Sequence, residues 1–157
     1  MPWNQTVFPD RLPRGFPGMP ANTRPTDQVS KICADAGGLN FGVAAFQGAA
    51  ANQVTATFTL NKFLGVTIRD VTKVRTQVNI ANIDKFEQYE QLAIMREGCI
   101  FVTTGVAVAV DDPAYVTPAG AFTNVPNGGA NEGPIGRWDS ATTGAALAVL
   151  ELMKRSS

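Results

Sequence analysis

Carboxylate side chains are the residues of this sequence best suited to chemistry. Asp84, Glu87 and Glu90 follow one another at three-residue spacing, and a second group is the adjacent pair Asp111–Asp112. Paired carboxylates can hold a hard cation or act as general acid and base. A lysine within the first group and a proline directly after the second instead favour solvated turns. We therefore predict no metal site at either group.

The other residue types needed for catalysis are scarce. The chain contains no histidine, so the commonest general base and transition-metal ligand is missing. Its two cysteines, Cys33 and Cys99, lack CxxC spacing and are predicted to be small buried side chains. The glycine-rich residues 36–50 lack the Gly-Lys-Ser/Thr ending of a phosphate-binding loop. We predict that the protein is not an enzyme, with no catalytic residues and no cofactor.

Charge and hydropathy restrict the partners. Thirteen basic and thirteen acidic residues cancel, so no net field draws the chain to nucleic acid or to an anionic membrane. The first residues lack the pattern of a signal peptide, and no apolar run approaches membrane-spanning length. We expect a protein that folds in a reducing cytoplasm and has neither nucleic acid nor membrane as a partner.

The first part of the chain is rich in proline. Six of the ten prolines fall within residues 1–25. Proline disrupts helices and cannot donate to a central strand of a sheet. This composition predicts an extended arm over residues 1–26, followed by one folded domain over residues 27–157. We expect the arm to be disordered in the isolated protein and ordered on a partner.

The arm carries more large apolar side chains and arginines than a disordered tail usually has. Arginines interleaved with aromatic rings can bind single-stranded nucleic acid by stacking. The same residues also suit a protein interface, because arginine pairs with carboxylates beside apolar contacts. We favour the protein interface. Its predicted partner-binding residues are Trp3, Phe8, Arg11, Leu12, Arg14, Phe16, Met19 and Arg24.

Beyond the arm, short apolar stretches alternate with turn residues. The predicted strands are residues 53–60, 65–71, 91–97, 99–110, 135–139 and 146–152, with very short strands around Tyr115 and Phe122. Gly98 separates two of these strands, and Gly105 predicts a bend within the longest. Residues 82–91 are the one predicted helical turn. Short strands separated by turns predict an all-β fold, a single small β-barrel or jelly-roll-like β-sandwich domain.

Three stretches of the sequence resemble the structural cement proteins of tailed bacteriophages. They are FLGVTIRDVTKV at residues 63–74, residues 84–123, and GPIGRWDSATTGAALAVLEL at residues 133–152. The resemblance covers most of residues 37–152 in order. It implies a β-barrel or jelly-roll-like fold, homo-oligomers on the capsid and no catalysis.

The resemblance leads us to expect a phage head protein, a cement or decoration subunit that binds the outside of the major capsid protein lattice. Such a subunit clamps neighbouring capsomers and stabilises the icosahedral capsid. The expected partners are the major capsid protein and further copies of this chain, as a dimer or trimer. The expected location is the outer surface of the virion head, after synthesis in the host bacterial cytoplasm. The alternative is a phage tail or receptor-binding β-sandwich module that recognises a host surface ligand.

Overall fold

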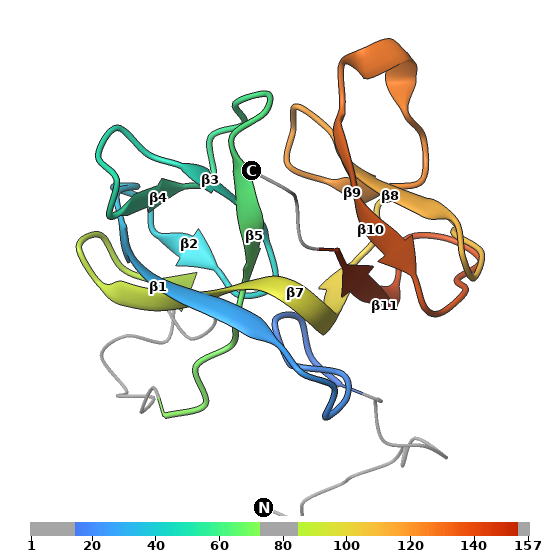
Figure 1. Ribbon diagram of the computed structural model, residues 1–157, viewed down its shortest axis with the longest axis horizontal. Helices are drawn as coiled ribbons and strands as arrows, with labels where there is room; N and C mark the ends of the chain where they lie inside the picture. The colour runs from blue at the N-terminus through green and yellow to red at the C-terminus, as the bar shows by residue number, and fades with distance from the viewer. Residues whose placement is uncertain (1–14, 73–84, 154–157) are drawn as a thin grey trace, which may run out of the picture.

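The computed structural model describes residues 15–72 and 85–153, and this part of the chain is built from β-strands (Figure 1). The strands are β1 (Asp27–Cys33), β2 (Leu39–Asn40), β3 (Ala44–Gln47), β4 (Gln53–Thr55), β5 (Phe63–Thr67), β6 (Lys85–Phe86), β7 (Gln91–Thr103), β8 (Pro113–Val116), β9 (Phe122–Thr123), β10 (Glu132–Trp138) and β11 (Leu147–Leu152). A short 3-10 helix at Asn127–Gly129 is the one helical element of the described residues. The predicted all-β fold is confirmed.

Half of the molecule is a small closed barrel. Its strands follow the order β1-β4-β3-β5-β7, and β1 also pairs with β7, which closes the ring. The barrel is the group of strands at the left of Figure 1. A closed ring leaves no unpaired strand edge that another chain could extend.

The other half continues from the same long strand. Beyond Gly98, β7 pairs with β11, and the sheet proceeds through β10 and β8 to β9. Its far edge curls back, because the amide of Gly105 donates to the carbonyl of Phe122 at 3.0 Å. In Figure 1, β7 passes between the two groups of strands. Each half therefore depends on β7 for a central partner.

Gly98 marks the point where β7 changes partners. Residues up to Glu97 pair with β1, and residues from Gly98 onward pair with β11. Gly98 has a φ of 127°, and a Cβ there would lie 2.7 Å from the Thr26 side chain. Our prediction of two strands separated at this glycine is wrong, because the strand bends there and continues.

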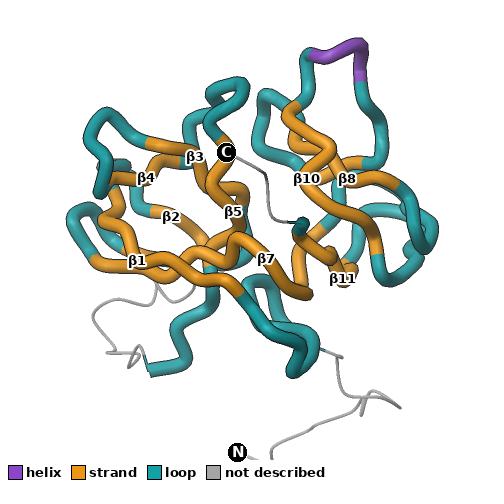
Figure 2. Tube along the Cα trace, in the orientation of Figure 1, coloured by secondary structure: helices purple, strands orange, loops and turns teal. Residues whose placement is uncertain are grey.

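Two clusters of buried side chains fill the molecule, whose strands are drawn in orange in Figure 2. The smaller includes Leu92 and Ile94 of the closed barrel. The larger includes Phe46 of the barrel and the completely buried Trp138 of β10, so it joins the two halves. Along β3, Ala45 belongs to the first cluster and Phe46 to the second, since successive side chains of a strand point to opposite faces.

The predicted strand at residues 53–60 is wrong beyond Thr55. The carboxylate of Asp35 accepts hydrogen bonds from the Thr55 hydroxyl at 2.5 Å and from the Ala56 amide at 2.6 Å. These bonds turn the chain out of the sheet. Leu60, the last residue of that predicted strand, is 46% exposed.

Three other predicted elements differ in extent or type. The strand predicted at residues 99–110 ends at Thr103, because the buried Thr104 hydroxyl bonds to the Val106 carbonyl at 2.8 Å and turns the chain. The strand predicted at residues 65–71 is shifted to Phe63–Thr67. The predicted helical turn is wrong where it is described, since Lys85–Phe86 is a strand, while residues 82–84 lie outside the described part.

The last strand confirms its prediction. Residues Leu147–Leu152 alternate between partly and fully buried positions, and they pair with β7 and β10. None of the helices in the described part of the chain is long and apolar enough to cross a membrane.

Candidate binding surface

Residues 15–21, here called the docked segment, lie along β7. The amides of Gly18 and Ala21 donate to the carbonyls of Phe101 and Cys99, both at 2.8 Å, and the Phe101 amide donates to Met19 at 2.9 Å. Pro20 faces Ile100 in antiparallel pairing. The segment thus continues the pairing of β1 along the same edge of β7. Part of the arm that we expected to lie free is therefore attached to the folded body.

Two glycines allow the docked segment to approach so closely. A Cβ on Gly15 would lie 2.5 Å from the Phe101 ring. Gly18 has a φ of 81°, and a Cβ there would lie 2.8 Å from the Gly42 amide nitrogen and 2.9 Å from that of Arg69. A larger residue at either position would push the segment away from β7.

Arg69 holds the same segment from the side. Its guanidinium carbon lies 5.2 Å from the ring centroid of Phe16 and 5.2 Å from that of Phe41, and its amide donates to the Gly18 carbonyl at 2.8 Å. A cation over an aromatic face contributes about 0.5–1 kcal/mol at an exposed site. Phe41 is buried and Phe16 is 52% exposed, so the arginine links the segment to the barrel core.

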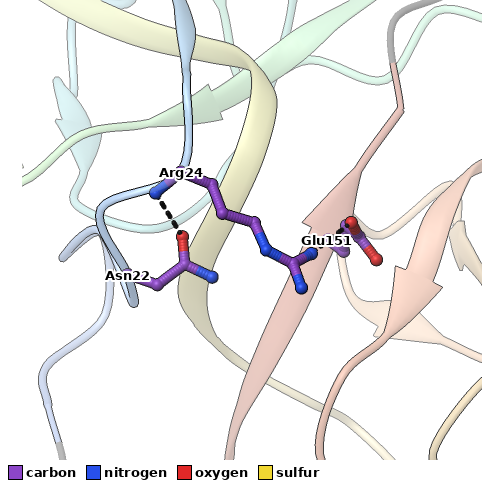
Figure 3. Close-up of polar contacts among 3 residues, drawn as sticks. All are labelled: Asn22, Arg24 and Glu151. Atoms are coloured by element: carbon purple, nitrogen blue, oxygen red, sulfur yellow. Dashed lines mark hydrogen bonds and ion pairs between the residues drawn. The ribbon is translucent and has the colours of Figure 1, made fainter.

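Arg24 ties the end of the arm to the second half of the molecule. Its guanidinium lies 2.9 Å from the Glu151 carboxylate of β11, and its amide donates to the Asn22 side chain at 3.1 Å (Figure 3). Both charged side chains of the ion pair are well exposed, at 60% and 41%. Exposed pairs contribute little, so this contact orients the chain more than it stabilises the fold.

The predicted partner-binding residues fall into two groups. Phe16 and Met19 lie in the docked segment with 52% and 37% of their surface exposed. Arg24 follows the segment by three residues. The remaining ones, Trp3, Phe8, Arg11, Leu12 and Arg14, lie outside the described residues. Their role in binding stays a prediction, as does the division of the chain at Thr26.

The structure adds Arg69 and Val71 to the candidate partner-binding residues. Arg69 stacks on Phe16, and Val71, two residues later, is 82% exposed. We call the exposed side chains of Phe16, Met19 and Val71, together with the partly buried Arg69, the arm-root surface. Sequence reasoning missed Arg69 and Val71 because it placed both within a strand, where neither stood out from its neighbours.

Members of both carboxylate groups serve as hydrogen-bond acceptors in turns. Glu90 accepts the amide of Glu87 at 2.7 Å. Asp112 accepts the amide of Ala109 at 3.0 Å and the side-chain amide of Asn124 at 2.7 Å. Asp84 lies outside the described residues. Within residues 15–72 and 85–153, no three metal-binding side chains gather into a group.

Asp112 gives a testable pH effect. The hydrogen bond from Asn124, followed by that from Ala109, lowers the pKa of Asp112 below its ordinary value of 3.8. A lowered folded-state pKa stabilises the protein above the unfolded pKa, and this stabilisation disappears as pH falls through the folded value. We expect Asp112→Asn to lower stability at pH 7 and to change it progressively less below about pH 4.

Denaturant unfolding of both proteins from pH 7 to about pH 2.5 checks this expectation. Asp111→Asn is the matched control, since it removes the same charge from a carboxylate that makes no hydrogen bond within the described part of the chain. A stability difference for Asp112→Asn that does not shrink toward low pH would contradict the assignment.

Taken together, these features define a small all-β protein in which residues 15–21 are docked along β7. A family profile described as "Structural cement protein (E217 gp24/Pam3 gp6)" matches residues 4–153. The chain belongs to this family of phage structural proteins, which confirms the resemblance seen in the sequence.

Comparison with solved structures gives a matching fold. A chain of the structure titled "The capsid of Myoviridae Phage XM1" superposes with a TM-score of 0.68 at 16% identity. The match covers 96% of this chain and 97% of that one. At this identity the likeness shows a shared fold. A search of curated proteins found no match.

Proposed function

We propose that this protein is a cement subunit of a phage head, which binds the outside of the major capsid protein lattice and clamps neighbouring capsomers. The carrying observation is the docked segment, which fixes the arm to the folded body beside the exposed arm-root surface. Family membership and the shared fold with a chain of a phage capsid structure support this role.

The docked segment is fixed to the folded body, so it determines how far the preceding residues can reach. Fourteen residues precede Gly15, and they include Trp3, Phe8 and Leu12 together with Arg11 and Arg14. In an extended polyproline geometry they would span roughly 40 Å, enough to cross onto a neighbouring capsomer. Apolar anchors with arginines beside them fit the composition of protein interfaces.

The remaining features of the role follow from this one. The subunit self-associates as a dimer or trimer, resides on the outer surface of the virion head and is made in the host bacterial cytoplasm. It acts by binding and has no catalytic activity, in keeping with the absence of histidine. It contacts neither nucleic acid nor membrane, in keeping with its zero net charge.

Decoration of isolated heads tests the proposal. Heads that lack this protein and tails of the same phage are prepared separately. Purified protein is added to each, and both samples are imaged by cryo-electron microscopy. We expect regular added density on the outside of the heads, with bare tails. Density confined to tails would contradict the proposal and favour a receptor-binding module. Heads without added protein are the control.

A further inference from the structure

We propose that the docked segment exchanges between copies of this chain, so that residues 15–21 of one copy pair with β7 of a second copy. The edge of β7 at Cys99–Phe101 would then be a self-association site, occupied in the isolated chain by its own segment. Strand exchange rests on the self-association proposed above and is independent of capsid binding.

The first support is how the segment is held. Backbone hydrogen bonds to Phe101, Cys99 and Arg69 connect it to the body, and none of its side chains belongs to either buried cluster. Phe16, Met19 and Pro20 are exposed even in the docked state. A segment with few buried apolar contacts opens locally at much lower cost than global unfolding.

The second support is what opening would uncover. Beneath the segment, Cys99 is 1% exposed and Phe101 is 8% exposed. Their main-chain groups bond to the segment, so release would leave an apolar strand edge with unpaired amide and carbonyl groups. Such an edge is a template for pairing with another chain.

The third support identifies the occupant. Close approach requires a residue without Cβ against the Phe101 ring and a second one, three positions later, against Gly42. The docked segment supplies both as Gly15 and Gly18. An incoming strand must repeat this pattern and spacing, and the same segment of another copy does so.

The connection to the body suits exchange. Residues 22–26 join the segment to β1, and Thr23, Arg24, Pro25 and Thr26 are exposed. An exchanged segment makes the same contacts with β7 as a segment docked on its own chain. The free-energy cost of exchange is therefore chiefly that of bringing two copies together, and it depends on protein concentration. Docking within one copy competes with exchange, because the segment meets its own β7 at an effective concentration of about 1 mM. Neighbouring subunits held on a shell meet one another at comparable effective concentrations.

A disulfide can report on which copy the segment occupies. The pairing of Pro20 with Ile100 places Ala21 directly opposite Cys99. Opposite residues of antiparallel strands have Cα atoms about 4.5–5.5 Å apart, within the range of a disulfide. One full-length copy carries Ala21→Cys and Cys99→Ser with a size tag. The other keeps Ala21 and Cys99, and both carry Cys33→Ser.

The two copies are mixed from about 10 μM to about 1 mM and oxidised mildly. We expect a cross-linked pair of mixed size that increases with concentration. Gly18→Val in the tagged copy should reduce its yield by about tenfold, because a β-branched side chain at that positive φ cannot dock. A single chain with Ala21→Cys and native Cys99 is the control for docking within one copy.

Two results would overturn the exchange. One is the absence of a mixed pair at every concentration while the single-chain control forms its internal disulfide. The other is measured by light scattering if that control does not oxidise. It is an oligomer mass that Gly18→Val leaves unchanged, or a monomeric mass at all concentrations. Failure of head decoration would bear on the proposed function and leave the exchange intact, since these measurements use protein in solution.

Discussion

Removal of residues 1–14 is expected to weaken binding to heads at least tenfold while leaving the thermal unfolding midpoint unchanged. Burial of one large apolar side chain contributes about 1.5–3 kcal/mol, and about 1.4 kcal/mol corresponds to a factor of ten in affinity. The deleted residues include Trp3, Phe8 and Leu12 as candidate anchors. The folded body keeps the docked segment, so its own contacts are not disturbed.

Removal of residues 1–26 is expected to weaken binding equally and also to lower the unfolding midpoint. This deletion removes the docked segment, which exposes Cys99 and Phe101 and ends the hydrogen bonds that pair them with Met19 and Ala21. The closed barrel and the second half keep their pairing through β7, so the truncated chain should still fold.

Occupancy on heads and thermal unfolding, measured for both truncations beside the full chain, check these expectations. A matched control replaces Trp3, Phe8 and Leu12 with serine in the full-length chain, which keeps the arm but removes its apolar anchors. Full occupancy of heads by the chain lacking residues 1–14 would show that the arm has no part in binding.

Trp138→Ala is expected to destabilise the folded protein by about 3–5 kcal/mol, the range for truncating a large aromatic core residue. Trp138 is completely buried in the cluster that joins the barrel to the second half. Its main chain also bonds to Asp112 at 3.0 Å and Asp111 at 2.8 Å. The substitution leaves a cavity within the larger cluster, while these backbone bonds remain.

For a chain of this size, that loss corresponds to a fall of roughly 6–20 °C in the unfolding midpoint. Trp138→Phe is the informative companion, because it keeps an aromatic ring and removes the indole N–H, which has no hydrogen-bond partner among residues 15–72 and 85–153. We expect it to cost clearly less than alanine. Val125→Ala, at a side chain that is 52% exposed, should change stability by less than about 0.5 kcal/mol.

A loss below about 1 kcal/mol for Trp138→Ala, measured by denaturant unfolding, would contradict a stabilising role of Trp138 in the cluster that joins the two halves. A loss of equal size for Trp138→Phe would show that the indole, and not the filled volume, provides the stabilisation.

The sequence by itself determined the fold class and the strands whose pattern is local. Short apolar stretches separated by turn residues predicted an all-β fold. The glycine before residues 146–152, and an apolar run too short for a stable helix, predicted a strand that is observed at Leu147–Leu152. Both signals lie within a few neighbouring positions, so the sequence alone is enough to reveal them. Motifs in their order along the chain also predicted the family that the profile match shows.

Tertiary structure decided where strands end and how the docked segment is held. The strand β4 ends at Thr55 because of hydrogen bonds to Asp35, twenty residues earlier in the chain. The docked segment depends on Phe101 and on Arg69, which lie far from it in sequence. Hydrogen bonds and close contacts of this kind join residues whose proximity exists only after the chain has folded, so no local pattern of apolar, glycine or proline residues encodes them.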